Sequence, residues 1–407
     1  MGTDQLIPVV DEGLGNSAYL LDLGDRRALA VDPSRDLRAV YGAVARRGLR
    51  VAYAAETHLH ADFVSGARQL HADYDATILA SAAGDRLFGH VRLGDGDEVD
   101  LGGLTLRALQ TPGHTPEHLS YLILDGSIEV GVFTGGSLIV GAAARTDLIG
   151  SEYTVELARA QYASLRRLAT LPDPTAVWPT HGAGSFCSAP PGAERVSTIG
   201  REKATNPLLG APDEDTFVAR LLGSLGSYPT YFAHLAEVNR RGPGLLDPDA
   251  TLAELTAAQT WRLLADGAVL VDVRPVHDYA AGHVPGALSI PLRDQFATWL
   301  GWLLTPGTPV VVVRNPDQDP ADIVWPAFAI GFEQIRGELA GGVAGWTAEG
   351  GLLRHNRLLA PDQVDAGSVV DVRQDSEYEA AHIPGARHVE LGDLTRRAAD
   401  LPAAPTG

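Results

Sequence analysis

Two histidines and an aspartate stand at alternate positions in the N-terminal half of the chain. His58, His60 and Asp62 follow residues 51–55, an apolar run that is typical of the end of a buried strand. Side chains at positions i and i+2 of an extended segment point the same way, so that His58 and His60 can face a single ion. Imidazole nitrogens bind zinc, iron and other borderline metals. The spacing predicts a metal site at a strand end, in preference to a surface loop that happens to carry two histidines.

Further stretches fit the same plan. His114 lies at the tip of a Pro-Gly turn, and His118 follows four residues later. Residues 178–184 carry His181 after another apolar run, and residues 132–138 form a glycine-rich turn at the end of a predicted strand. Each stretch therefore places a candidate residue where a strand gives way to a loop.

The elements that must position these residues alternate between strands, turns and helices. Apolar runs separated by turns predict short strands, for example within residues 16–32 and 104–109, and residues 153–170 have helical spacing. Residues 197–241 are predicted to be mainly helical, and Gly and Pro residues then mark a boundary. We expect a first domain over residues 1–245.

These motifs resemble those of a known family. The first stretch is similar to the His-x-His-x-Asp-His signature of the metallo-β-lactamase superfamily, and residues 111–115 are similar to its Thr-Pro-Gly-His-Thr motif. The resemblance implies the α/β (α+β) fold class, with an αββα sandwich. Residues 199–207 resemble the C-terminal extension of persulfide dioxygenases and their glyoxalase-II-like relatives.

Two positions depart from the family pattern. The last histidine of the signature, which helps to hold a second metal, is Phe63 here. The Asp of the family's Phe-Thr-Gly-Asp motif, a metal ligand that bridges two ions where two are bound, is Gly136. The resemblance implies that persulfide dioxygenases hold one iron with two histidines and this Asp, so the sequence departs from them at a ligand position too. His181 matches a histidine of the second metal site, but Asp62 and His181 alone would supply too few ligands to hold a second ion. The resemblance therefore implies one ion per chain.

The remaining ligands define the predicted centre. Three histidines with open positions, His58, His60 and His114, make a complete mononuclear set for one divalent metal ion, iron or zinc. Asp62 is the candidate catalytic residue, as a base or as the holder of a bound water. We expect the metal to depend much less on His181, which is a candidate for a second site or for a supporting position.

Other residues are expected around this centre. His118 is predicted at the surface or in a supporting position more than among the ligands. Arg145 and Asp147 are similar to the family's Gly-Arg-x-Asp-Leu loop; they could orient an anionic substrate, but we favour an ion pair that braces the loop. The acid missing at Gly136 leaves a three-histidine site with a charge of about +2, which favours an anionic thiolate ligand. We also expect this glycine to widen the cavity beside the ion.

A second pattern occurs twice in the C-terminal part. Residues 270–274 and 369–373 both contain Val-Asp-Val-Arg, and each is followed by a His-x-Pro-Gly-Ala motif. Both copies resemble rhodanese-like domains. We expect an α/β domain over residues 250–355 and a partial second one over residues 356–407. The second copy contains only about the first half of such a domain, and its end has the composition of a linker or of a truncation.

Neither copy carries the cysteine nucleophile that rhodanese chemistry needs. Arg314 follows the predicted central strand, residues 310–313, where the nucleophilic loop would begin, and the only cysteine, Cys187, lies in the first domain. Sulfur transfer through a cysteine persulfide of this domain is therefore not expected. A role in docking a protein partner is predicted instead.

Composition limits the remaining possibilities. The chain of 407 residues has 45% hydrophobic and 20% charged residues, which is typical of a soluble globular protein with two or three domains. A net charge of -19 argues against nucleic acid as a partner, and no run approaches the ~20 apolar residues of a membrane span. One cysteine excludes an intrachain disulfide, so a reducing, cytoplasmic location is expected.

The sequence thus predicts a mononuclear metalloenzyme of sulfur metabolism that resembles glutathione-persulfide dioxygenases. Its expected substrate is a small thiol or persulfide. The first alternative is a zinc-dependent thioesterase or hydrolase of the glyoxalase II type. The second is a non-catalytic sulfur-carrier or partner-binding protein with a degenerate metal site.

Overall fold

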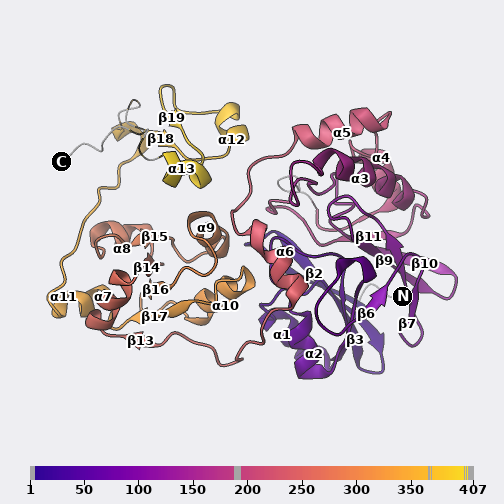
Figure 1. Cartoon of the computed structure of the whole chain (residues 1–407), viewed down its shortest axis with the longest axis horizontal. Helices are drawn as coiled ribbons and strands as arrows, with labels where there is room; N and C mark the ends of the chain where they lie inside the picture. Colours follow the sequence, from indigo (N-terminus) through magenta and orange to yellow (C-terminus); the bar gives the residue numbers. More distant parts are fainter. Residues whose placement is uncertain are drawn as a thin grey trace. The chain divides into compact units, whose positions relative to one another are not determined.

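The chain forms two compact units in the computed structural model, each of which is described by itself (Figure 1). The structure describes residues 5–187, 194–364, 367, 369–397, 399 and 401. The first unit comprises residues 1–225, 231–249 and 328–331, and the second comprises residues 226–230, 250–327 and 332–407. Among the described residues, no helix has the length and apolar character needed to span a membrane.

Two six-stranded sheets form the centre of the first unit, in the strand orders β1-β2-β3-β4-β5-β6 and β12-β11-β10-β9-β8-β7. The strands of the first sheet are β1 (Leu6–Asp11), β2 (Asn16–Gly24), β3 (Arg27–Val31), β4 (Arg50–Glu56), β5 (Thr77–Ser81) and β6 (Val91–Leu93). Those of the second are β7 (Glu98–Asp100), β8 (Thr105–Gln110), β9 (Leu119–Asp125), β10 (Ile128–Gly135), β11 (Ala176–Pro179) and β12 (Ser197–Thr198). The hairpin predicted within residues 16–32 is therefore present as β2 and β3.

Helices cover the outer faces of both sheets. They are α1 (Arg38–Arg47), α2 (Ala67–Tyr74), α3 (Thr154–Leu168), α4 (Ile199–Thr205), α5 (Glu214–Gly223) and α6 (Phe232–Arg241), with a 3-10 turn, η2, at Ala82–Gly84. Figure 1 shows α1 and α2 on one side of the unit and α3, α4 and α5 on the other. The helices predicted within residues 153–170 and 197–241 are confirmed.

Successive side chains of one strand enter different cores, because they point to opposite faces of the sheet. On β2, Tyr19 and Leu21 lie in the core between the sheets, whereas Leu20 packs among side chains of α1 and α2. On β9, Tyr121 enters the same central core, and Leu122 packs among side chains of α3 and α5. The three cores confirm the predicted αββα sandwich.

The second unit contains a five-stranded parallel sheet in the order β13-β17-β16-β14-β15. Its strands are β13 (Glu254–Leu255), β14 (Val269–Asp272), β15 (Leu288–Ser289), β16 (Val310–Val313) and β17 (Ile335–Leu339). Its helices are α7 (Ala257–Ala265), α8 (Val276–Ala281), α9 (Phe296–Leu303), α10 (Ala321–Ala329) and α11 (Gly342–Ala348). The four valines of β16 are all buried, as expected for a central parallel strand.

The C-terminal copy is smaller. It contains η3 (Pro361–Gln363), β18 (Val370–Asp371), α12 (Asp375–Ala380), β19 (Arg387–His388) and α13 (Leu391–Arg397). Its two strands pair in parallel. Residues 402–407, the end of the predicted partial copy, lie outside the described residues.

Candidate metal centre

The loops that carry the predicted ligands follow strand ends at one edge of the sandwich. β3 and β4 run parallel in one sheet, and β10 and β11 run parallel in the other. Because carboxyl ends of parallel strands meet at the same edge of a sheet, the loops after these strands come together. A bridge between Asn16 and His181 joins the two sheets there, and Ser17 N donates to Thr180 O at 2.7 Å.

Asp32, directly after β3, orients the two histidines that follow β4. Its Oδ2 accepts a hydrogen bond from the Thr57 hydroxyl (2.7 Å), which accepts in turn from His58 Nδ1 (2.9 Å). His60 Nε2 donates to Asp32 Oδ1 (3.2 Å). The other nitrogens, Nε2 of His58 and Nδ1 of His60, are buried without a hydrogen-bond partner among the described residues. Such outer hydrogen bonds fix the tautomer and orientation of metal-binding histidines.

Asn16, at the start of β2, holds His181 and Asp62 in the same way. Asn16 Nδ2 donates to Asp62 Oδ2 (2.8 Å), and His181 Nδ1 donates to Asn16 Oδ1 (3.0 Å). Within the described part of the chain, His181 Nε2 and Asp62 Oδ1 are buried and unpartnered. A buried polar atom without a partner costs about 1–3 kcal/mol. Together with the two nitrogens of His58 and His60, these atoms fit a bound metal ion.

His114 reaches the same place from the second sheet. Its Nδ1 donates to Arg145 O (2.7 Å), and its backbone N–H donates to Gln161 Oε1 on α3 (2.8 Å). The Nε2 atom is therefore the nitrogen left to bind a ligand. The His114 ring centroid lies 4.7 Å from that of His58 and 5.2 Å from that of His181.

Two groups of donor atoms lie close enough to share an ion, since the atoms of each group are within 4.8 Å of one another. The first group is His58, His60 and His181, and the second is His114, His181 and Cys187. The predicted trio of His58, His60 and His114 is not among the groups found in the described residues, and it stays a prediction. His181 belongs to both groups, which gives it a larger part than the sequence predicts.

His118 is buried behind these donors. Its Nδ1 donates to Thr111 Oγ1 (2.9 Å), and its Nε2 accepts from the backbone N–H of Gly136 (3.1 Å). Because both ring nitrogens are used, His118 is not one of the donors. His118 is therefore not at the surface, and its supporting role stays a prediction.

Both positions that depart from the family pattern are filled by rings. Phe63 is buried and stacks on His60, with ring centroids 4.1 Å apart at an interplanar angle of 24°. A Cβ atom on residue 136 would lie only 2.4 Å from Cδ2 of His114. The expectation that Gly136 widens the cavity is therefore wrong, because the His114 ring occupies the space beside it.

Burial and charge divide the histidines. Burial, followed by the charges of neighbouring histidines, holds the pKa of His58 well below its usual value and lowers the pKa of His114 to about 3. At His181 burial also opposes the charged form, but electrostatic interactions and hydrogen bonding with Cys187 and Asp62 outweigh it and raise its pKa. His181 in turn outweighs the effect of burial on Asp62, whose pKa is lowered. His58 and His114 are thus neutral, as metal ligands must be, whereas His181 must give up a proton when it binds a metal ion.

Arg145 lies in the loop beside His114. Its Nε and Nη2 donate to the two carboxylate oxygens of Asp147, at 2.7 and 2.9 Å, and its Nη1 donates to Phe186 O (3.0 Å). The Arg145 side chain is almost fully buried. The pair between Arg145 and Asp147 is present, and its role in bracing the loop stays a prediction.

Sequence reasoning missed three residues of the centre: Asp32, Asn16 and Cys187. Asp32 ends an apolar run and adopts a φ of 49°, a left-handed conformation that Asp tolerates better than most residues. Its place one residue after a buried strand was the available signal. Cys187 follows His181 by six residues, and its spacing matches no motif named above.

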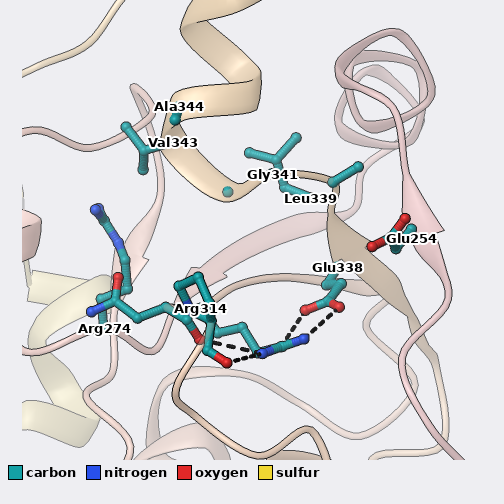
Figure 2. A pocket seen from close by; sticks show the side chains of 12 residues that line it. Glu254, Arg274, Arg314, Glu338, Leu339, Gly341, Val343 and Ala344 are labelled. Atoms are coloured by element: carbon teal, nitrogen blue, oxygen red, sulfur yellow. Dashed lines mark hydrogen bonds and ion pairs between the residues drawn. The ribbon is translucent and has the colours of Figure 1, made fainter.

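The nucleophile position of the second unit is closed by Arg314, directly after β16. Its Nη2 donates to Glu338 Oε1 on β17 (2.9 Å), and its Nη1 donates to Asn315 O (3.3 Å) and Gln318 O (2.8 Å). Figure 2 shows the guanidinium turned toward Glu338 at the side of a cavity of about 410 Å³. Carbonyl groups therefore surround a cation where a rhodanese loop presents N–H groups to a persulfide. Docking of a protein partner by this unit stays a prediction.

Comparisons with known proteins agree with the motifs. The metallo-beta-lactamase superfamily model matches residues 11–181, and the rhodanese-like domain model matches residues 256–349 and 356–406. Mitochondrial persulfide dioxygenase ETHE1 of Homo sapiens is 30% identical over 216 residues, 51% of this chain and 76% of that protein. A hydroxyacylglutathione hydrolase of Methylococcus capsulatus is 33% identical over 243 residues, 53% of this chain and 89% of that protein.

Solved structures extend the similarity over both units. A metallo-beta-lactamase from Staphylococcus aureus subsp. aureus COL has a TM-score of 0.71 at 28% identity and covers 82% of this chain and 98% of its own. ETHE1 from Myxococcus xanthus has a TM-score of 0.50 at 30% identity and covers 58% of this chain and 97% of its own.

Proposed function

Since this chain belongs to the metallo-beta-lactamase superfamily, we propose that it is a mononuclear metalloenzyme that oxidises a small thiol or persulfide with dioxygen. The similarity to persulfide dioxygenases supports the reaction class. The rhodanese-like unit fits sulfur metabolism, although its nucleophile position is occupied by Arg314. Glutathione persulfide is the first substrate to test.

One observation carries the choice between this reaction and hydrolysis. The His114 ring fills the space in which a side chain at residue 136 would begin, 2.4 Å from the ideal Cβ position. A carboxylate that bridges two ions has no place there, and Phe63 takes the position of another second-site ligand. The geometry therefore favours one ion over two, although the same acid is a ligand that the resemblance implies for the one-iron site of persulfide dioxygenases.

The residues of the chain have separable roles in this reaction. Bound ferrous iron would supply open positions at which an anionic sulfur and dioxygen react. His58, His60 and His181 offer the nitrogens to hold it. Asp62 Oδ1 is buried and unpartnered within the described residues, so it can accept a hydrogen bond from a bound water or from the substrate. Asn16 keeps Asp62 in place through its bond to Oδ2 (2.8 Å).

A zinc-dependent hydrolase of the glyoxalase II type is the second candidate. The 33% identity to a hydroxyacylglutathione hydrolase over 89% of that protein favours it. Two metal ions and an intact bridging acid are what the resemblance implies for such enzymes, and Gly136 and Phe63 argue against both. A non-catalytic role is the third candidate, and the cost of leaving four buried polar atoms unpartnered argues against it.

The test combines metal analysis with two assays on the full chain. We expect close to one iron per chain and oxygen uptake with glutathione persulfide. Asp62→Asn, which keeps the shape and the bond to Asn16, should reduce oxygen uptake while the metal content remains. Two zinc ions per chain with thioester cleavage and no oxygen uptake would replace this proposal with the hydrolase. A metal-free protein, inactive in both assays after reconstitution, would support the third candidate.

A further inference from the structure

Cys187 lies fully buried beside the metal centre. Its Sγ forms a group with the ligand nitrogens of His114 and His181, all within 4.8 Å of one another. The Nε2 of His181 is buried and lacks a geometrically sound hydrogen bond among the described residues, so the thiol faces a nitrogen that can bind a metal ion once it is deprotonated. A buried cysteine that serves only for packing is usually surrounded by apolar side chains.

The position of the thiol is fixed by the loop that carries it. Cys187 N donates to Ser185 Oγ (3.2 Å), and Arg145 N donates to Cys187 O (3.2 Å). The Arg145 guanidinium also holds Phe186 O (3.0 Å). The same residue, Arg145, accepts the Nδ1 hydrogen of His114 at its own carbonyl (2.7 Å). The Cys187 loop and the His114 ring are therefore tied to one support.

A thiolate ligand at Cys187 would compensate part of the positive charge of a bound metal ion. A three-histidine site leaves the full charge of a dication uncompensated, because imidazole ligands are neutral and residue 136 has no carboxylate. A thiolate carries one negative charge, and a bound metal ion deprotonates a coordinating thiol. Cys187 can therefore supply the charge that Gly136 cannot.

We propose that Cys187 is a metal ligand, which together with His114 and His181 forms a His₂Cys site for a soft or borderline divalent metal. Because each residue offers one ligand atom, an ion in this site takes His181 away from the group that it forms with His58 and His60. Thiolate and imidazole ligands select zinc and iron over magnesium or calcium. This inference rests on the proposed function only because both need a bound metal. The site differs from the group of His58, His60 and His181 in one respect that can be measured, namely a sulfur atom bound to the metal.

The experiment uses the fact that Cys187 is the only cysteine of the chain. Apo-protein, freed of added thiols, is titrated with cobalt(II) alone, and we expect a sulfur-to-cobalt charge-transfer band that saturates near one equivalent. X-ray absorption on the zinc form should show one sulfur at about 2.3 Å besides nitrogen at about 2.0–2.1 Å. Only nitrogen and oxygen scatterers around the metal in the wild-type protein would overturn the proposal.

Variants locate the site within the cluster. Cys187→Ser should abolish the charge-transfer band, and cobalt should still bind, but with lower affinity. His181→Ala should also remove the band. Asp22→Asn, near the end of β2, is a matched control that leaves the Cys187 loop unchanged and should keep the band. Persistence of the band in Cys187→Ser would also overturn the assignment. Oxygen uptake is measured separately. A sulfur ligand without oxygen uptake would contradict only the proposed function, and oxygen uptake without a sulfur ligand would contradict only this inference.

Discussion

The metal centre and the Arg314 loop both lack residues that their families use, but they differ in what fills the gap. At the metal centre, His58 Nε2, His60 Nδ1 and His181 Nε2 are buried without partners among the described residues. At the second unit, Arg314 fills the nucleophile position and bonds to Glu338 and two carbonyl oxygens. One site is left open for a ligand, and the other is closed by the chain itself.

This difference shows how a degenerate motif should be interpreted. A lost residue removes a function when the surrounding polar groups are satisfied without it, because nothing is then gained by a ligand. Where the surrounding groups remain unpartnered, each costs about 1–3 kcal/mol until a ligand binds. The number of open donors decides between a binding site and a structural one more reliably than the number of matched motif residues.

The strongest test of the open site is His181→Ala. His181 belongs to both donor groups, so we expect its loss to weaken metal binding by about 1,000-fold, roughly one third of the 10–16 kcal/mol of a structural zinc site. His118→Asn is the matched control, since both nitrogens of His118 are already bonded within the protein. Competition with a chelator measures both affinities. Equal losses in the two variants would contradict the donor groups.

In the second unit, where Arg314 closes the nucleophile position, we expect substitutions to lower the stability of the unit and not to change ligand binding. Asp272 is fully buried and pairs with Arg274 (2.6 Å), whereas the same pair in the second copy, Asp371 and Arg373 (2.6 Å), is exposed at the arginine. Asp272→Asn leaves a buried guanidinium charge without its carboxylate, and it should destabilise the unit by about 3 kcal/mol. Asp371→Asn should have little effect. Hydrogen exchange of the β14 and β16 amides measures the difference, and similar protection in both variants would count against it.

Asp32→Asn tests the support of the open site. The carboxylate accepts from His60 Nε2, from the Thr57 hydroxyl and from the Thr180 hydroxyl. Outer partners of metal ligands are typically worth 10–100-fold in metal affinity, and we expect a loss in about that range. Asp22→Asn, near the end of β2 and outside the metal centre, is the control and should bind metal as the wild type does. An unchanged affinity in Asp32→Asn would remove Asp32 from the site.

Acid should destabilise the metal-free protein. Burial lowers the pKa of His58, of His118 and of His114, the last to about 3. Below pH 6.5 the unfolded chain binds protons that these folded histidines reject, so their stability contribution falls as the pH falls toward 3, by up to about 1.4 kcal/mol per pH unit for each. The raised pKa of His181 acts in the opposite sense. Denaturant midpoints between pH 7 and 4 check the sign, and His118→Asn should flatten the slope.

The last prediction is that the protein has no thiosulfate:cyanide sulfurtransferase activity. The wild-type protein should form no thiocyanate from thiosulfate and cyanide, because Arg314 occupies the nucleophile position and the only cysteine lies in the other unit. Thiocyanate production that Cys187→Ser abolishes would place the metal-centre thiol in the reaction and would blur the contrast between the two regions.

The sequence predicted the sandwich, the parallel sheet and the strand-end histidines, because these depend on local spacing. The arrangement of His118 could be predicted only as far as a supporting position. Asn16 could not be recognised, since it is a single polar residue whose partners lie elsewhere in the chain, and Asp32 offered only its place directly after a buried strand. The prediction that Gly136 widens the cavity was wrong for another reason. The space beside a glycine depends on the side chain that packs against it, and here that side chain is the ring of His114, which comes from a different loop.

The repeat was visible in the sequence, and its contacts recur at the same offset. Tyr279 stacks on His283, and Tyr378 stacks on His382, in both cases with ring centroids 3.8 Å apart. The motif thus predicted local packing as well as topology. The burial of each copy could not be predicted in this way, because it depends on the elements that surround the motif.

The bridge between Asn16 and His181 has a consequence for the order of folding. The bond from His181 Nδ1 to Asn16 Oδ1 joins residues 165 positions apart, one from each sheet. Contacts of such long sequence separation form late, since the loop must be closed before the contact stabilises it. The donors converge only after both sheets have formed, so the ion cannot act as a template for the nascent chain. Metal loading is therefore a step that follows folding, and the apo-protein should accept its ion without being unfolded.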